Sequence, residues 1–311
     1  MTNVLTEQDL QERYAWGIDR KIEESCNRIV DWYSRHNGHV CISFSGGLDS
    51  TVLLDLVRNK CGYEDVPAVF SNTGLEFPEN VQFVRSFANV VEVRPRRNFR
   101  QVIEKFGYPV VSKRVAQYAG EVQRAKGDTA TLRLRMTGVK SDGSVSKLGE
   151  LPEVWKPLVS APFKVSDACC RILKKEPLRR VQKMYGPPFI GTRAQESKQR
   201  ELTYKTTGCN AYHLAEPHST PIAFWTHADV KEYIKRESLP YSKLYDMGYT
   251  RSGCMWCMFG AHYRDDDRFC LLEVTHPKIY RYCKEKLKLF DVLDFIVDLW
   301  ENRFKRKRGE L

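Results

Sequence analysis

The chain has 311 residues, 42% of them hydrophobic, so it is long enough to bury a sizeable core in one large domain or two smaller ones. No stretch approaches the roughly 18 uninterrupted apolar residues that a membrane span requires. The net charge of +11 favours a polyanionic partner. Ten cysteines in so long a chain exclude the class of small secreted proteins that are stabilised by disulfides, and they favour metal binding or sulfur chemistry.

The start of the chain is too polar for a secretory signal, so the sequence predicts a cytoplasmic protein that does not associate with membranes. Basic residues gather at 94–100, at 174–180 and in the tail at 303–308. Each cluster alone is equally well explained as solvated surface. Together they make nucleic acid a serious candidate partner.

Hydrophobic periodicity predicts strands and helices in alternation. A helix over 18–35 is followed by a strand at 39–45 and a helix at 51–58. Further strands are predicted at 67–72, 90–93, 188–191 and 222–225, and further helices at 79–88, 99–106, 167–185 and 226–237. This order is typical of an α/β fold, a parallel twisted sheet with helices on both faces. Residues 127–150 are polar and aperiodic, which predicts an insertion or mobile loop.

The segment Ser-Gly-Gly-Leu-Asp-Ser-Thr at 45–51 separates the first predicted strand from the helix after it. Ligands of a parallel sheet bind beyond the carboxyl ends of its strands. The two glycines let backbone approach a ligand, and free N–H groups at a helix start favour phosphate. Hydroxyls of Ser45, Ser50 and Thr51 add donors, and Asp49 can hold a magnesium ion. The segment is neither a Walker A loop nor a Gly-x-Gly-x-x-Gly motif.

This segment resembles the pyrophosphate-binding loop of the ATP pyrophosphatase superfamily. Residues 70–79 (FSNTGLEFPE), 190–197 (IGTRAQES) and 221–249 are similar to signatures of the phosphoadenosine phosphosulfate (PAPS) reductase family, in the family's order. The resemblance covers residues 38–260 and implies a PP-loop fold of the adenine nucleotide alpha-hydrolase type. It places that domain at 38–225, after a helical extension at 1–37 and before a helical, cluster-binding subdomain at 226–311 that ends in the basic tail.

The resemblance also implies roles for individual residues. It predicts that ATP and magnesium are held by Ser45, Gly46, Gly47, Asp49, Ser50 and Thr51, and that Asn72, Thr73 and Gly74 frame the nucleoside. Arg193 and Arg200 are planar, permanently charged donors that would stabilise developing charge, and Asp49 is predicted to be catalytic together with them. Lys113 and Arg114, at the start of a predicted helix, are further candidate anion contacts.

Four cysteines form two pairs. Cys169 and Cys170 are adjacent on a predicted helix, and Cys254 and Cys257 form a Cys-x-x-Cys turn about 80 residues later. Four thiolates suit zinc or an iron–sulfur cluster. Adjacent cysteines are awkward for one tetrahedral ion and suit a cubane, and the pattern resembles the cluster signature of bacterial and plant-type adenylylsulfate reductases. We predict a 4Fe–4S cluster on these four residues, with zinc as the alternative and unliganded buried thiols third.

Cys209 follows Thr206-Thr207-Gly208, a flexible setting, and is predicted to replace one cluster ligand or to carry a persulfide. Two features depart from the sulfonucleotide reductases. Their mobile tail with a nucleophilic cysteine has no counterpart in residues 306–311, and the loop glycine and serine that they tend to lose are present as Gly47 and Ser50. Both departures favour ATP as substrate, with AMP and pyrophosphate as products.

The sequence therefore predicts an iron–sulfur ATP pyrophosphatase similar to the components of bacterial DNA phosphorothioation systems. It would activate DNA or RNA for sulfur transfer, with a cysteine desulfurase as sulfur donor, and a homo-oligomer is compatible with it. One alternative is a sulfonucleotide reductase that uses Cys209 or a partner's cysteine. A sulfate adenylyltransferase-like subunit explains the loop but not the four cysteines. A non-enzymatic nucleic-acid-binding module with a structural cluster is the remaining alternative.

Overall fold

The computed structural model describes the backbone of residues 4–307 and side chains up to residue 302, so the side chains of the basic tail at 303–308 lie outside the described residues. The chain forms two compact units from interleaved segments. The first comprises the chain up to Asn72, Glu76–Arg94 and Pro177–Ser252, and the second comprises Thr73–Leu75, Pro95–Glu176 and the chain from Gly253. Within residues 4–307, no helix has the length and apolar character needed to cross a membrane.

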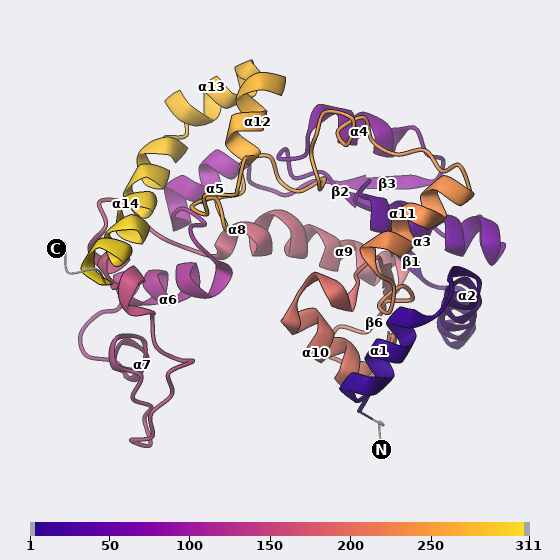
Figure 1. Cartoon of the computed structure of the whole chain (residues 1–311), viewed down its shortest axis with the longest axis horizontal. Coiled ribbons are helices and arrows are strands. Elements are labelled where there is room, and N and C mark those ends of the chain that lie inside the picture. Colours follow the sequence, from indigo (N-terminus) through magenta and orange to yellow (C-terminus); the bar gives the residue numbers. More distant parts are fainter. Residues whose placement is uncertain (1–3, 308–311) are drawn as a thin grey trace. The chain divides into compact units, whose positions relative to one another are not determined.

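The first unit contains a six-stranded sheet with strand order β3-β2-β1-β4-β6-β5. Its strands are β1 (Cys41–Ser43), β2 (Ala68–Ser71), β3 (Val90–Val93), β4 (Pro188–Ile190), β5 (Asn210–Ala211) and β6 (His218–Ser219). All neighbours are parallel except β5 and β6, which pair antiparallel at one edge. The central strand β1 places Ile42 beside Ala68 of β2 and Phe189 of β4. Figure 1 labels β1, β2, β3 and β6 of this sheet. The predicted α/β class with a mainly parallel sheet is confirmed.

Successive β1 side chains point to opposite faces of the sheet, and Cys41 and Ile42 are both buried. Helices therefore cover both faces. Ile42 packs in the main core with Trp32 and Leu53, whereas Cys41 packs with Val181. The helices of the unit are α1 (Glu7–Ala15), α2 (Ile18–Arg35), α3 (Leu48–Asp55), the π-helical turn η1 (Leu56–Lys60), α4 (Pro78–Arg85), α9 (Glu176–Tyr185), the short 3-10 turn η4 (Ala194–Glu196), α10 (Lys198–Thr207) and α11 (His227–Arg236). The sheet thus presents the carboxyl end of β1 directly to the start of α3.

The second unit is helical. It contains α5 (Phe99–Phe106), α6 (Lys113–Arg124), α7 (Ala130–Thr137), η2 (Glu153–Ser160), α8 (Ala168–Cys170), the π-helical turn η3 (Arg171–Lys175), α12 (Arg268–Thr275), α13 (Pro277–Glu285) and α14 (Leu289–Lys307). Trp155 of η2 stacks on Trp300 of α14 with ring centroids 5.7 Å apart and an interplanar angle of 5°. Aromatic stacking of this kind joins the C-terminal helix to the middle of the chain.

Two predictions of local backbone structure are wrong: residues 127–150 are not all loop, and residues 222–225 are not a strand. The segment 127–150 contains a helix, α7, because Thr129 caps it by accepting a hydrogen bond from the amide of Leu132 and Gly138 ends it at φ 75°. No side chain of α7 is buried, so it shows no apolar stripe in the sequence. Residues 222–225 are buried as expected but form turns, with the amide of Trp225 bonded to the carbonyl of Ile222 at 3.0 Å.

Glu92 of β3 joins neighbouring elements of the first unit through charged hydrogen bonds. Its carboxylate accepts from Arg85 at 2.8 Å, from Arg94 at 2.9 Å and from the Asn72 amide at 2.9 Å. The hydrogen bond from Arg85, followed by those from Arg94 and Asn72, lowers the pKa of Glu92 to about 2. A lowered folded-state pKa contributes stability above the unfolded pKa, and this contribution disappears as pH falls toward 2.

We expect Glu92→Gln to lower the free energy of unfolding by about 1–2 kcal/mol at pH 7, a figure reduced for solvent screening. The deficit should shrink between pH 4.5 and pH 2, and urea titrations across that range measure it. Glu104→Gln is the control, because Glu104 is exposed and pairs with Arg100 one helical turn away. A deficit for Glu92→Gln that is equal at all pH values contradicts the assigned role.

Candidate functional site

The segment 45–51 forms a closed turn between β1 and α3. The carbonyl of Gly47 accepts hydrogen bonds from the hydroxyls of Ser50 at 2.9 Å and Thr51 at 3.1 Å. The Ser45 hydroxyl lies 3.1 Å from that of Ser50 and accepts from the amide of Gly47 at 3.3 Å. The predicted hydroxyl donors therefore hold the loop's own shape, and they surround the start of α3, where helix N–H groups favour an anion.

Both loop glycines are required by their surroundings. Gly46 has φ +74°, and a Cβ atom there would lie 2.6 Å from Cγ2 of Val84. A Cβ atom on Gly47 would lie 2.8 Å from the Ser252 hydroxyl. Gly191, after β4, packs against the loop so closely that its Cβ would lie 2.9 Å from the carbonyl of Asp49. Close packing of backbone on backbone fixes where the loop turns.

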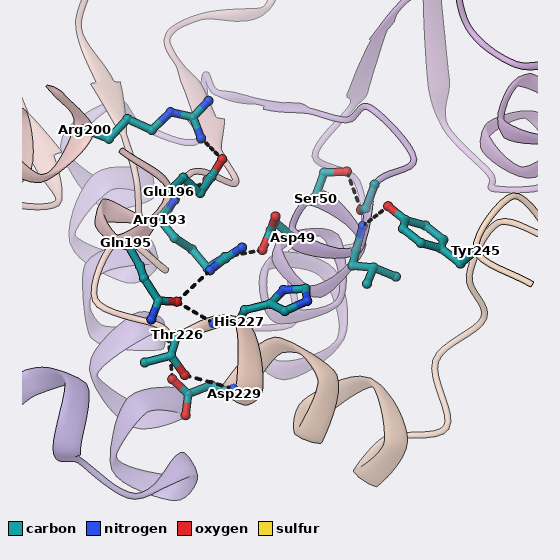
Figure 2. A network of polar contacts seen from close by, with 12 residues as sticks. Asp49, Ser50, Arg193, Gln195, Glu196, Arg200, Thr226, His227, Asp229 and Tyr245 are labelled. Carbon is teal, nitrogen blue, oxygen red and sulfur yellow. Dashed lines mark hydrogen bonds and ion pairs between the residues drawn. The ribbon is translucent and has the colours of Figure 1, made fainter. Parts of the chain in front are cut away.

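Arg193 and Asp49 form an ion pair beside the loop, with Nε 2.5 Å from Oδ1. The Arg193 side chain is 8% exposed and that of Asp49 is 28% exposed. Nη1 of Arg193 also donates to Oε1 of Gln195 at 3.3 Å, and the same oxygen accepts the amide of His227 at 2.9 Å. Figure 2 shows these four residues connected in series. These contacts hold the buried guanidinium of Arg193 rigidly beside the start of α3.

Arg200 lies at the edge of this network, on α10. Its guanidinium pairs with Glu196, whose other oxygen accepts the amide of Arg193 at 2.8 Å. Burial lowers the pKa of Arg200, and the charges of Asp49 and Arg193 act on it in opposite directions. The structure thus brings together Asp49, Arg193 and Arg200, the three charged residues that the sequence predicted to act jointly.

The predicted nucleoside-binding residues follow β2. Asn72 belongs to the first unit, where its amide nitrogen donates to Glu92. Thr73 and Gly74 belong to the second unit, where the Thr73 hydroxyl accepts the amide of Leu75 at 3.1 Å and Gly74 has φ +78°. The three residues are therefore consecutive in sequence but divided between the units.

The four predicted cluster cysteines all lie in the second unit. Cys169 is buried, whereas Cys170, Cys254 and Cys257 are partly exposed. Burial raises the pKa of Cys169, and charges on the other three thiols raise it further, so the four sulfurs share one neighbourhood. Among residues 4–307, no three His, Cys, Asp or Glu side chains are spaced to hold a single metal ion.

Backbone hydrogen bonds tie the Cys-x-x-Cys turn to two other predicted site segments of the second unit. The amide of Met255 donates to the carbonyl of Leu75 at 2.8 Å, directly after Thr73 and Gly74. The amide of Gly260 donates to the carbonyl of Val111 at 2.9 Å. Lys113 and Arg114 follow Val111 as the exposed first residues of α6. The cysteine turn is thus attached on both sides to candidate ligand-binding segments.

The placement of Cys209 does not suit a nucleophile. The residue is 6% exposed, and burial raises the pKa of its thiol to about 11. Reactive cysteines are accessible and have a lowered pKa. Cys209 also belongs to the first unit, whereas the four cluster cysteines belong to the second.

The sequence profile of the phosphoadenosine phosphosulfate reductase domain matches residues 39–126 and 131–259. The chain belongs to this family. An uncharacterized protein of Methanocaldococcus jannaschii is 28% identical over 80% of this chain and 42% of its own length, and a second one is 26% identical over 90% and 53%. The chain thus spans about half the length of these two relatives.

Other proteins that are similar to this PAPS reductase family protein are named after enzymatic activities. The adenosine 5′-phosphosulfate reductase of Lysinibacillus sphaericus is 25% identical over 77% of this chain and 82% of that enzyme. The phosphate complex of phosphoadenylyl-sulfate reductase from Candida auris aligns with a TM-score of 0.44 and 18% identity, over 80% of this chain and 96% of that one.

Sequence reasoning missed two residues that shape the loop of this family member. Asn80 is fully buried, and its amide donates to the carbonyl of Ser45 at 2.8 Å. The Tyr245 hydroxyl accepts the amide of Leu48 at 3.2 Å, which caps the first turn of α3. Tyr245 lies in the family-like segment 221–249 and Asn80 directly follows the one at 70–79. Polar side chains that bond backbone leave no pattern of their own in a sequence.

We expect Gly46→Ala to lower the free energy of unfolding by roughly 2–4 kcal/mol, since it combines left-handed backbone with a clash. Gly62→Ala is a matched control: Gly62 has the same φ of +74°, yet nothing lies within 4 Å of its Cβ position. That variant should lose only about 1 kcal/mol. Urea unfolding measures both, and equal losses would show that contact with Val84 and Asn80 is irrelevant.

Proposed function

We propose that this protein is an ATP pyrophosphatase that activates a nucleic acid for sulfur transfer, using a 4Fe–4S cluster. The ATP pyrophosphatase part of the proposal rests on the intact loop with both glycines, next to the pairing of Asp49 with the buried Arg193. Membership of the PAPS reductase family supports a nucleotide substrate. The net charge of +11 supports a polyanionic acceptor.

The residues of the loop have separate tasks in this proposal. Amides at the start of α3 bind the β- and γ-phosphates, and Gly46 and Gly47 leave room for them. An oxygen of the acceptor attacks the α-phosphorus, and the bond to the leaving pyrophosphate breaks. Arg193 faces the charge that develops on the leaving group, held in position by Asp49 and Gln195. A sulfur nucleophile then displaces AMP from the adenylated acceptor.

Asp49 is the loop residue whose chemistry fits magnesium. One oxygen accepts from Arg193, and the side chain is 28% exposed, which leaves carboxylate surface open to solvent. Magnesium is bound through one or two carboxylates together with substrate phosphates. When bound, it neutralises phosphate charge. The role of Asp49 is then to hold both the cation and the orientation of Arg193.

The donor chemistry of the four cysteines fits a 4Fe–4S cluster better than zinc. Two adjacent cysteines are awkward for one tetrahedral ion, whereas four thiols in one neighbourhood suit a cubane. When bound, the cluster would supply redox-active iron to the sulfur-transfer step. The protein's part is to position it: Arg268 donates to the carbonyl of Cys257 at 2.6 Å and pairs with Asp266.

A sulfonucleotide reductase is the second candidate, favoured by the relatives named adenosine 5′-phosphosulfate reductase. That reaction needs a nucleophilic thiol. The buried Cys209, with its raised pKa, is poorly suited to supply one. An exposed thiol of a partner protein would be required.

Pyrophosphate release from ATP and magnesium tests the proposal, using protein purified without oxygen. We expect release that depends on magnesium and is abolished by a chelator. The comparison protein is Asp49→Asn, which keeps the size of the side chain and removes its charge. Release at the wild-type rate by Asp49→Asn contradicts the assigned site.

A further inference from the structure

A pocket of about 750 Å³ opens beside the start of α3, entirely within the first unit. Its volume is within the range of about 300–1,000 Å³ that is usual for ligand sites. Leu48, the first residue of α3, contributes to its wall. Tyr245 does as well, and its hydroxyl accepts the Leu48 amide, so the pocket borders the phosphate loop.

One side of the pocket is a row of cationic and imidazole side chains on α11. His227, Lys231 and Lys235 follow at intervals of four residues, which places them on one face of the helix. Both lysines are exposed, and no carboxylate among residues 4–307 lies within ion-pair distance of either. Two other charged residues on this helix do have partners: Asp229 pairs with the buried Lys21 at 2.6 Å and Arg236 pairs with Asp19 at 2.6 Å. The two lysines are therefore available for an anion.

The lining also includes three tyrosines. Tyr241, Tyr245 and Tyr249 line the pocket, and the rings of the first two lie 6.3 Å apart at 75°. Tyr249 packs on Phe77 with centroids 4.5 Å apart. Asp246 is the acidic residue of the lining, and it accepts a hydrogen bond from the Tyr241 hydroxyl at 3.2 Å. Tyr241 is 45% exposed, so its ring has a free surface.

Unpaired cations and aromatic rings that line one pocket match the chemistry of a nucleic acid strand. Phosphates bind to lysines, and unstacked bases bind to aromatic faces. A duplex does not offer free base faces, so the pattern selects a single strand or a flipped-out nucleotide. His227 connects the pocket to the catalytic pair: its amide binds Gln195, and the charges of Arg193 and Asp49 both act on its ring.

We propose that this pocket binds one or two nucleotides of a single-stranded nucleic acid and brings the acceptor next to the ATP loop. The inference rests on the proposed function, because it names where that acceptor lies. Lys231 and Lys235 contact phosphates, and Tyr241 stacks on a base. Tyr245 separates the acceptor from bound ATP.

Fluorescence anisotropy with a labelled single-stranded DNA and an RNA of the same sequence tests the pocket. Lys231→Ala/Lys235→Ala should weaken binding about tenfold or more and reduce the slope of log affinity against log salt by about 1.4. Tyr241→Leu should weaken binding about tenfold, with the salt slope unchanged. Whichever of the two oligonucleotides binds more tightly identifies the acceptor as DNA or RNA.

Lys183→Ala/Lys286→Ala is the charge-matched control, since both lysines are exposed and neither lines the pocket. Oligonucleotide binding equal in control and pocket variants overturns the inference, even if the wild type releases pyrophosphate. A rise in KM for ATP in the pocket variants that is as large as their loss of oligonucleotide affinity also overturns the inference, because the pocket would then hold ATP. Loss of binding in the pocket variants without any pyrophosphate release leaves the pocket standing and defeats the proposed function instead.

Discussion

Arg193→Lys is expected to slow pyrophosphate release from ATP by about 10²–10³-fold. Lysine keeps the positive charge beside Asp49 but lacks the planar fork that binds Asp49 and Gln195 at once. The ammonium therefore cannot be held in the same direction. Because the charge is kept, the carboxylate of Asp49 stays compensated, and the free energy of unfolding should fall by no more than about 1–2 kcal/mol.

Two comparisons separate a catalytic loss from misfolding. Arg236→Lys is the matched control, because Arg236 is exposed and pairs with Asp19 in the same unit, away from the loop. It should retain wild-type activity. Urea unfolding of Arg193→Lys should give a single transition close to that of the wild type. Full activity in Arg193→Lys would remove this arginine from the mechanism.

Cys254→Ser is expected to lower bound iron by at least about tenfold in protein purified without oxygen. A hydroxyl is a poor iron ligand compared with a thiolate, and Cys254 opens the turn that is bonded to Leu75. Visible absorbance from thiolate-to-iron charge transfer should bleach in parallel. Iron and sulfide analysis together with the absorbance spectrum measure the loss.

The control for that variant is Cys270→Ser. Cys270 is an exposed cysteine on α12 of the same unit, and it should keep iron and colour. Colourless wild-type protein that contains stoichiometric zinc would contradict the cluster. Equal bleaching in both variants would show that the iron is not bound at the four predicted cysteines.

The sheet and the loop could be predicted because each has a local signal. Buried strands such as β1 and β2 show as short apolar runs, and the glycines and hydroxyls of residues 45–51 mark the turn after β1. Alternation with amphipathic helices then indicates a parallel sheet. The antiparallel edge strand β5 has only two residues, too few for a period-two pattern, and was not predicted.

Other features depend on contacts that no local pattern carries. Residues 222–225 are apolar because they are buried, and burial alone does not say whether their backbone pairs with a strand or turns on itself. Cys209 follows a flexible-looking Thr-Thr-Gly segment, yet tertiary packing against Tyr204 and its neighbours buries it. The pairing of Arg193 with Asp49 spans 144 residues, so sequence could propose both partners but not their contact.

The most direct test of the central claim is to identify the products formed from ATP labelled at both the α- and the γ-phosphate and, separately, from sulfur-labelled adenylylsulfate with a thiol reductant. We predict AMP and pyrophosphate in equal amounts from ATP with magnesium, and no sulfite from adenylylsulfate. Release of sulfite without any cleavage of ATP would contradict the account and identify the protein as a sulfonucleotide reductase.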